Sequence, residues 1–212
     1  MFDFLEGATE QSQCTAALPG GLWMKRAFDI VVAGVLLVPM ILIALALCVL
    51  NPLLNPGPVF FRQVRMGRDC QSFVAWKFRT MCATKVPKRG AFDGLDTDRV
   101  TPLGRVLRAV RADELPQIIN VLAGEMSMIG PRPDALSHAL QYVVEVPGYA
   151  DRYRLRPGIS GYAQTEVGYV DTREALHRKV AADLHYLAHW SLAFDLWIVW
   201  RTLIVVLRRE GR

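Results

Sequence analysis

The sequence predicts a mainly α-helical, membrane-associated fold with one small β-hairpin. Three observations predict it: an uncharged apolar run at residues 30–50, alternating apolar and polar residues at 59–78, and helical periodicity in later segments. A chain of 212 residues is long enough for a membrane element and one domain of about 150 residues. We therefore expect a mobile tail at 1–23, a membrane segment at 24–58 and one domain at 59–212.

The charge balance favours a phosphorylated or lipid partner over nucleic acid. The chain has 25 Lys+Arg and 20 Asp+Glu, a formal net charge of +5, yet 52% of its residues are hydrophobic. A basic protein that binds DNA is usually less apolar, so we expect anionic lipid or a phosphorylated ligand and no nucleic acid. The four cysteines lack C-x-x-C spacing, which predicts reduced thiols and no zinc site.

The apolar run at 30–50 has the length of a membrane element, because 21 residues at about 1.5 Å each match the roughly 30 Å hydrocarbon core. Pro39 near its middle predicts a kink or a break. Basic residues flank the run on both sides: Lys25, Arg26, Arg62, Arg65 and Arg68. This symmetry gives no orientation for a single span. Two alternatives stay open: a kinked spanning helix, or a re-entrant hairpin that bends at Pro39 and returns to the same side.

The prolines that follow, Pro52, Pro56 and Pro58, predict the end of the membrane helix after Leu50. Alternation in VFFRQV and SFVAWKF then predicts a β-hairpin that turns at MGRDC.

Residues 83–98 are polar and aperiodic, which indicates a loop. The loop contains Asp96-Thr97-Asp98, a pattern that can hold a divalent ion and a nucleotide diphosphate. Acidic triplets are common and no apolar strand leads into this one, so we favour a plain loop.

Residues 101–124 divide into a helix, a junction and a second helix that Gly124 ends. The apolar stripe of the second helix consists of Leu115, Ile118, Ile119 and Leu122. Asp113 then takes the N-cap position, Glu114 lies in the first turn, and Pro116 stands where a missing N–H costs nothing. Helix capping is therefore one explanation of the two adjacent acids.

Capping does not explain Arg105, Arg108 and Arg111, which recur every third residue just before this helix start. Such an arrangement suits a phosphate or pyrophosphate. With a divalent cation, one carboxylate could hold Mg2+ while the other attacks phosphorus. Phosphoryl transfer and a capped helix with surface ion pairs both stay open on the residues alone.

Two proline-containing turns each present an arginine: Arg132 in IGPRP and Arg156 in RPGI. Rigid turns that present a guanidinium group suit oxyanions, although each turn by itself is ordinary loop chemistry.

The chain from Thr172 to Arg212 is predicted to be helical, and it is rich in tryptophan. Helices lying in the membrane interface and helices of an ordinary core are equally compatible with this pattern. His185 and His189 have i, i+4 spacing but lack the glutamate of a zinc-protease motif, which favours hydrogen-bonded histidines. No P-loop, dinucleotide-binding or serine-esterase motif occurs in the sequence.

Seven segments, in this order, resemble the bacterial sugar transferases, the monotopic polyprenyl-phosphate hexose-1-phosphate transferases, in their small single-domain form. They are KRAFDI, GPVFFRQVRMG, FVAWKFRTM, DRVTPLGRVLR, DELPQIINVLAGEMSMIGPRP, RPGISGYAQ and WSLAFDLWIVWRTL. The resemblance covers about residues 24–208. It implies a re-entrant membrane helix broken at Pro39, interfacial amphipathic helices, and a location on the cytoplasmic face of the bacterial inner membrane.

The resemblance also implies a phosphoglycosyl transferase. Such an enzyme moves a sugar-1-phosphate from a UDP-sugar to undecaprenyl phosphate, releases UMP and starts a surface glycan such as exopolysaccharide, capsule, O-antigen or glycoprotein. Asp113 would attack the β-phosphate and form a covalent phosphosugar intermediate, and Glu114 would ligate Mg2+. Positions near the phosphate and nucleotide site match Lys77, Arg79, Arg132, Arg156 and Gln164. Membrane lipids are further expected partners. The sequence does not fix the oligomeric state, and a homodimer stays open as one alternative.

The sequence departs from the family at two places. Arg111-Ala112 precedes the acidic pair where relatives commonly have Thr or Ser two places ahead, and TEVGYVDTR follows GYAQ where many relatives continue V-x-G-R. The second departure leaves the usual sugar-side contacts unassigned. Two other functions are weighed against phosphoglycosyl transfer: a membrane glycosyltransferase that releases UDP and uses residues 96–98 for its metal, and a non-catalytic membrane scaffold.

Overall fold

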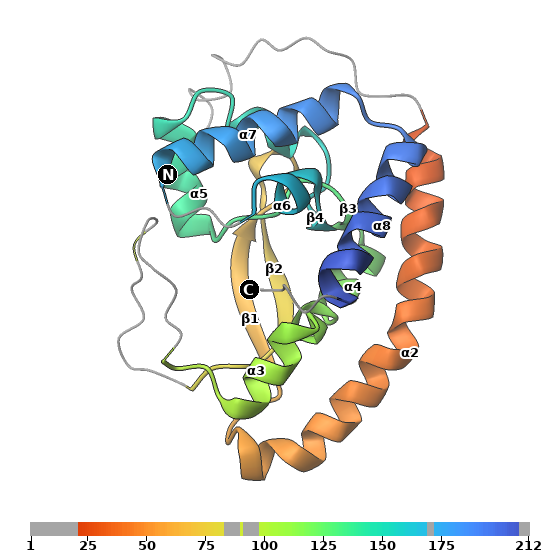
Figure 1. Ribbon diagram of the computed structural model, residues 1–212, viewed down its shortest axis with the longest axis vertical. Coiled ribbons are helices and arrows are strands. Elements are labelled where there is room, and N and C mark those ends of the chain that lie inside the picture. Colours follow the sequence, from red (N-terminus) through yellow and green to blue (C-terminus); the bar gives the residue numbers. More distant parts are fainter. Residues whose placement is uncertain (1–20, 83–89, 91–97, 169–171, 208–212) are drawn as a thin grey trace.

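The computed structural model describes residues 21–82, 90, 98–168 and 172–207. The expected tail lies almost entirely outside these residues, as does most of the loop at 83–98. The elements, in chain order, are α2 (Leu22–Leu54), β1 (Phe60–Met66), η1 (Arg68–Cys70), β2 (Ser72–Phe78), α3 (Pro102–Ala109), η2 (Ala112–Glu114), α4 (Gln117–Ala123), β3 (Ser127–Ile129), α5 (Leu136–Glu145), η3 (Ala150–Arg154), β4 (Gly158–Ser160), α6 (Tyr162–Glu166), α7 (Arg173–Ala188) and α8 (Leu192–Leu207). A mainly helical fold with a small antiparallel hairpin is confirmed (Figure 1).

Helix α2 contains the apolar run and extends beyond it at both ends. It is one continuous 33-residue helix with Pro39 and Pro52 inside it, and its ribbon bends along its length (Figure 1). The predicted end after Leu50 is wrong by one turn, because Pro52 is accommodated near the end and the helix stops at Asn55. Within the described residues, it is the one helix long and apolar enough to cross a membrane.

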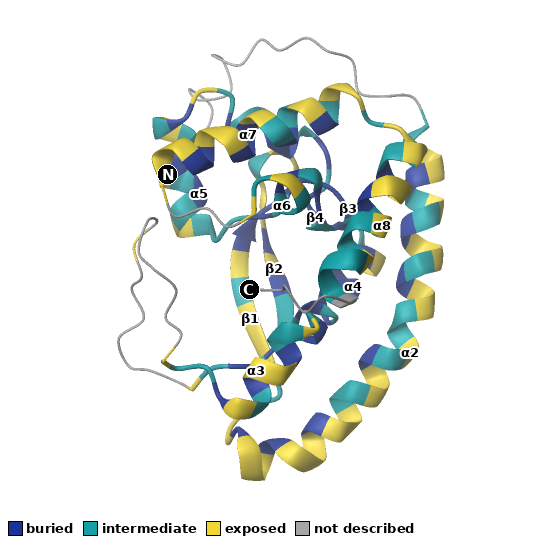
Figure 2. Cartoon of the chain, viewed as in Figure 1, coloured by how far each residue is buried: buried dark blue, intermediate teal, exposed yellow. Residues whose placement is uncertain are grey.

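One face of α2 packs against the domain, and the rest of the helix is largely exposed (Figure 2). Ala33, Met40 and Leu47 recur every seven residues, are buried, and share a core cluster with Ile118 and Val121 of α4. The exposed apolar residues of α2 include Val31, Val35, Val38, Leu42, Leu45 and Val49. Such a surface suits lipid better than water.

The predicted hairpin is confirmed. Strands β1 and β2 pair antiparallel from Phe60 opposite Phe78 to Met66 opposite Ser72. Helix α4 is fastened to β2 through Asn120, whose Nδ2 donates to the Val74 carbonyl (2.7 Å) and whose Oδ1 accepts from the Trp76 N–H (3.1 Å). The hairpin and the acidic junction before α4 are thus brought together.

The sequence did not predict strands β3 and β4, which form a short parallel pair with Ser127 opposite Gly158 and Ile129 opposite Ser160. The two backbones approach so closely after β3 that a Cβ atom on Gly130 would lie 2.5 Å from the Arg156 carbonyl oxygen. Glycine is therefore required at this crossing.

The C-terminal helices have both buried residues and exposed apolar residues, and their predicted place in the membrane interface stays a prediction. Thr172 caps α7 by accepting a hydrogen bond from the Ala175 N–H (3.1 Å). In α8, Asp195 and Ile198 are fully buried. Other large apolar residues of α8 are exposed: Leu196, Trp197, Trp200 and Leu203. This helix therefore contributes to the core and presents an apolar face outward.

Candidate active site

The two adjacent acids lie in a 3-10 turn between α3 and α4. Arg111 has a left-handed backbone (φ 53°), and the turn η2 follows, with the Glu114 N–H donating to the Arg111 carbonyl (3.2 Å). The prediction that Asp113 caps α4 is wrong, because α4 begins at Gln117 and Pro116 occupies its N-cap position. The 3-10 turn supplies local hydrogen bonds ahead of α4, so the Asp113 side chain has no capping role.

The predicted apolar stripe of α4 is only partly buried. Ile118 is buried, but Ile119 and Leu122 are exposed, and Val121 takes the second core position. The reason is the orientation of α4, which turns Asn120 toward β2 and leaves the side with Ile119 and Leu122 outside.

Glu114 is buried and held by two cations from other parts of the chain. Lys77 Nζ of β2 lies 2.6 Å from Glu114 Oε1, and Arg132 contacts both carboxylate oxygens, with Nη1 3.0 Å from Oε2. Arg111 Nη1 lies 3.9 Å from Oε2. Burial alone would raise the pKa of Glu114, but Arg132 and Lys77 hold that pKa well below its usual value. Glu114 is therefore a fixed anion.

Asp113 has a different environment from its neighbour. Burial and the charge of Glu114 raise the pKa of its carboxyl, while Lys77, Arg108 and Arg132 act in the opposite direction. The two adjacent carboxyls are therefore separated in acidity, and Asp113, for which the described part of the chain offers no ion pair, is the more basic. A partly exposed, more basic carboxylate beside several cations is suited to attack an electrophilic phosphorus.

Three of the predicted phosphate-binding arginines come from α3 and the junction after it. Arg108 Nε donates to Thr80 Oγ1 (2.9 Å), and its charge acts on Asp113. Arg111 lies beside Glu114, and Arg105 is exposed one turn earlier on α3. Lys77, Arg132, Arg108 and Arg111 therefore form the cationic surroundings of the acidic pair.

Arg79 is not brought into this group. Its Nε donates to the Pro58 carbonyl (2.8 Å) and its Nη2 contacts the Asn55 carbonyl, so it fastens the end of α2 to β2. Its substrate-binding role stays a prediction.

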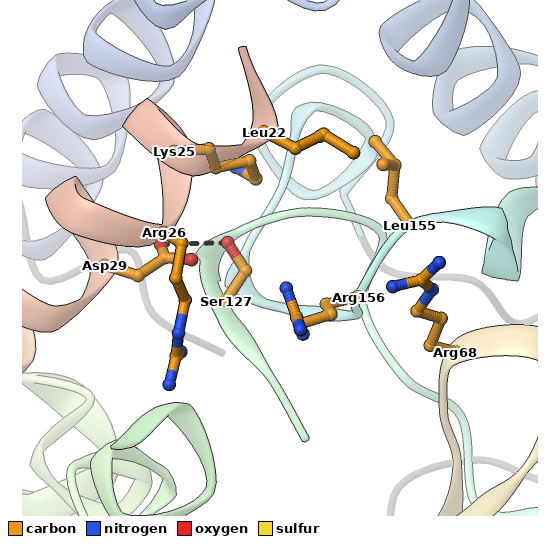
Figure 3. Close-up of a pocket in the computed structure, with 8 residues that line it drawn as sticks. All are labelled: Leu22, Lys25, Arg26, Asp29, Arg68, Ser127, Leu155 and Arg156. Carbon is orange, nitrogen blue, oxygen red and sulfur yellow. Dashed lines mark hydrogen bonds between the residues drawn. The ribbon is translucent and has the colours of Figure 1, made fainter. Parts of the chain in front are cut away.

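Arg156 lies at the other end of α4 from Glu114. Its Nε donates to the Gly124 carbonyl (2.7 Å), and Arg26 donates to the carbonyls of Val121 (2.6 Å) and Leu122 (3.0 Å). Both arginines thus satisfy carbonyl groups at the C-terminal end of the helix. Figure 3 shows Arg26, Arg156 and Arg68 around one hollow beneath the start of α2. Burial and the charges of Arg26 and Arg68 lower the pKa of Arg156.

Two glutamines near these segments have buried amide atoms to which the described residues offer no hydrogen bond. They are Gln164 of α6, through Oε1, and Gln117, through both Oε1 and Nε2. Gln117 is fully buried, three residues after Glu114. Gln117 and Thr80 were not predicted to belong to the site, although both lie inside segments that resemble the family, DELPQIINVLAGEMSMIGPRP and FVAWKFRTM.

The acidic pair is better suited to hold Mg2+ together with substrate phosphates than to bind it with protein ligands alone. Oε1 of Glu114 accepts from two donors, while among the described residues Oε2 accepts a hydrogen bond from Arg132 alone and keeps capacity for a further partner. No cluster of three or more His, Cys, Asp or Glu suited to a metal occurs in the described part of the chain. Mg2+ commonly uses one or two carboxylates together with substrate phosphates. The alternative metal triplet at 96–98 lies outside the described residues except for Asp98, and the TEVGYVDTR departure is only partly described.

Comparison with known proteins gives a consistent result. A family model described as bacterial sugar transferase matches residues 21–209. The chain is 44% identical over 184 residues to the UDP-glucose:undecaprenyl-phosphate glucose-1-phosphate transferase of Escherichia coli strain K12, which covers 85% of the chain and 39% of that protein. It is also 44% identical over 193 residues to the transferase of the same name from Caulobacter vibrioides, covering 88% of the chain and 71% of that relative.

A third relative differs in the sugar of its name. It is the UDP-N-acetylgalactosamine-undecaprenyl-phosphate N-acetylgalactosaminephosphotransferase of Aeromonas hydrophila, 40% identical over 205 residues, with 95% of the chain and 48% of that protein covered. The chain thus spans less than half the length of the Escherichia and Aeromonas relatives. The resemblance inferred from the seven segments is confirmed.

Proposed function

Because the chain belongs to the bacterial sugar transferase family, we propose that it transfers a sugar-1-phosphate from a UDP-sugar to undecaprenyl phosphate and releases UMP. The observation that carries the proposal is the asymmetry of the acidic pair. Glu114 is fixed by Lys77 and Arg132, whereas Asp113 has a raised pKa and no ion pair with any residue that the structure describes. One carboxylate organises the cations, and the other can react.

In the proposed reaction, a carboxylate oxygen of Asp113 attacks the β-phosphorus of the UDP-sugar. A new P–O bond to Asp113 forms, the bond to the oxygen that bridges the two phosphates breaks, and UMP leaves with that oxygen. The phosphate oxygen of undecaprenyl phosphate then attacks the same phosphorus and breaks the bond to Asp113. Undecaprenyl-diphosphate-sugar forms, and the Asp113 carboxylate is regenerated.

The cations around Glu114 supply the electrostatics of this step. Arg132, Lys77 and Arg108 place positive charge where the diphosphate would lie, so the charge that develops on the phosphate oxygens is stabilised. Arg132 presents a planar fork that matches phosphate oxygens. Glu114 and the phosphates would hold Mg2+, which neutralises phosphate charge when it is bound.

The contacts of α2 support a re-entrant topology with both helix ends on the cytoplasmic face of the inner membrane. Near one end, Lys25 Nζ forms a buried ion pair with Asp195 of α8 (2.7 Å). At the other end, Asn55 Nδ2 donates to the Arg79 carbonyl (2.8 Å). A helix that crossed the bilayer would put its two ends on opposite sides of the membrane. Both ends of α2 contact the same domain, which lies on one side only. A bend within one leaflet keeps the domain on one side.

The exposed apolar faces of α2 and α8 would then lie in the lipid and at its surface, with Trp197 and Trp200 at headgroup depth. Undecaprenyl phosphate would reach the site from this side. The product would start a surface glycan, and the different sugars in the names of the relatives leave the sugar open.

A panel of UDP-sugars tests the proposal directly. The protein in detergent or nanodiscs is incubated with each UDP-sugar, Mg2+ and undecaprenyl phosphate, and the released nucleotide is identified by chromatography. We expect UMP with at least one sugar. Release of UDP would support a transferase that moves the sugar alone, and no release with any sugar would support a scaffold.

A further inference from the structure

The segment that carries Arg132 is fastened at every residue. The carbonyl of Pro131 accepts from the Gly158 N–H (3.0 Å), that of Arg132 from Arg152 Nη2 (2.8 Å), that of Pro133 from Arg65 Nη1 (2.8 Å), and that of Asp134 from the Met66 N–H (3.1 Å). Four consecutive carbonyls outside any helix or strand are thus held by groups from β1, η3 and β4. This is more fixation than a surface turn needs.

Arg152 is the residue that connects this segment to the domain core. It is fully buried, and besides the Arg132 carbonyl it binds Asp134 through Nη1 (2.6 Å) and Asp183 of α7 through Nε (2.8 Å). Its guanidinium lies 5.0 Å from the ring centroids of both Tyr149 and Tyr153. Each nitrogen of this guanidinium is therefore hydrogen-bonded to a defined partner.

The surroundings of Arg152 are balanced in charge. Lys179 binds both oxygens of Asp134 (2.6 and 2.7 Å), so two cations face two acids, Asp134 and Asp183. Burial alone would raise the pKa of Asp134, but Lys179 and Arg152 hold it well below its usual value. The acids beside Arg152 keep the pKa of its guanidinium high, whereas burial raises the pKa of Asp183 and lowers that of Lys179.

A buried cluster of this kind is not explained by stability alone. Taking charges out of water is costly, and well-packed apolar residues often give equal or greater stability. What apolar residues could not supply is a directed donor to the Arg132 carbonyl. That hydrogen bond fixes the main chain from which the Arg132 side chain reaches Glu114.

We propose that Arg152 is a positioning residue that sets Arg132 against Glu114 and so holds the phosphate-binding arginine where the diphosphate reacts. This inference rests on the proposed function, because it assigns Arg132 to the substrate phosphates. Arg152 itself touches neither Glu114 nor the reacting atoms. It acts through the Arg132 carbonyl, while the carboxylates of Asp134 and Asp183 orient its guanidinium.

The test compares Arg152→Lys with Tyr149→Phe. Lysine keeps the charge but cannot reach three partners with a planar fork. Tyr149→Phe removes a hydrogen bond to Asp134 (2.6 Å) from the same cluster and leaves the Arg132 carbonyl bond in place. We expect Arg152→Lys to lower kcat/KM for the UDP-sugar at least 10-fold, per folded enzyme, and Tyr149→Phe to change it less than 2-fold.

A double-mutant cycle with Arg132→Lys decides whether the effect passes through Arg132. We expect the loss caused by Arg152→Lys to shrink to less than 2-fold in the Arg132→Lys background. Full additivity, or a folded Arg152→Lys enzyme with unchanged kcat/KM, would overturn the proposal.

A second variant covers the case in which Arg152→Lys does not fold. Arg152→Gln combined with Asp183→Asn removes the fork and leaves one cation and one acid, so the cluster stays neutral. The same loss is expected, and retained kcat/KM in this variant overturns the proposal. The proposed function is judged separately on the wild type: if it releases UDP or nothing, that function fails, whereas UMP release with additive variants overturns only the positioning role.

Discussion

Arg132 donates to both carboxylate oxygens of Glu114, with Nη1 3.0 Å from Oε2, while the main-chain carbonyl of Arg132 accepts from buried Arg152. Arg132 is thus held at both ends. Arg132 and Glu114 therefore hold each other in place. Asp113, the other of the two adjacent acids, takes no part in this ion pair. The consequences can be measured on single residues.

Glu114→Gln is expected to destabilise the protein as well as inactivate it. The substitution keeps the shape of the side chain but leaves Lys77 and Arg132 without their buried anion. Loss of one partner from a buried charged group costs about 2 kcal/mol or more. Chemical unfolding in detergent should show a lower midpoint than wild type, and an unchanged midpoint would contradict the ion-pair assignment.

Asp113→Asn should inactivate the protein without destabilising it, in contrast to Glu114→Gln. The raised pKa of Asp113 indicates that its charge is disfavoured by burial and by Glu114, so a neutral amide relieves repulsion. We expect unfolding stability equal to or above wild type, together with loss of UMP release by a factor of at least about 10³. A stable variant that keeps more than a tenth of the activity would exclude Asp113 as the nucleophile.

The pH profile should have an alkaline limb set by Lys77. Burial lowers the pKa of Lys77 to about 8, so its charge on Glu114 is present below that pH and lost above it. We expect kcat/KM to fall above about pH 8 and Lys77→Arg to move that limb upward. The effect on stability has the opposite sign. Between about pH 8, where folded Lys77 loses its proton, and about pH 10.4, where unfolded Lys77 does, the unfolded chain binds one more proton than the folded chain. The free energy of unfolding therefore rises with pH in this range. A limb that stays in place in Lys77→Arg would assign it to another group.

The re-entrant topology predicts that both ends of α2 face the same side. Single cysteines replace Met24 and Pro56, two exposed residues near the helix ends, in a chain whose natural cysteines are serines. In right-side-out and inverted vesicles, a membrane-impermeant maleimide should label both sites from the cytoplasmic side only. Labelling of the two sites from opposite sides would establish a spanning helix.

The sequence predicted the elements that are determined by neighbouring residues, such as the hairpin and the end of α4. The hairpin follows from alternation on both sides of MGRDC, and the end of α4 follows from Gly124, which adopts φ 86°. The N-cap prediction for Asp113 failed because Asp113 lies inside the 3-10 turn Ala112–Glu114, and α4 begins only after Pro116. Helix periodicity therefore located the acidic pair but not its backbone geometry.

Contacts between residues far apart in the sequence could not be predicted from local residue patterns. Strands of three residues such as β3 and β4 show no alternation, and their pairing joins Ser127 to Gly158. The contact between Lys77 and Glu114 crosses 37 positions, so only the family resemblance placed both near phosphate. In RYRLRPG, Arg152 looks like one of several surface arginines, and nothing in the sequence distinguishes the one that is fully buried.

The central claim, attack by Asp113 on the β-phosphate, is tested most directly without the lipid. The purified protein is incubated with its UDP-sugar and Mg2+ in the absence of undecaprenyl phosphate, and UMP release and the intact protein mass are followed together. We expect a burst of up to about one UMP per protein and a mass increase of one sugar phosphate, both absent in Asp113→Asn. UMP that appears only when undecaprenyl phosphate is added, with no mass increase at any time, would contradict it.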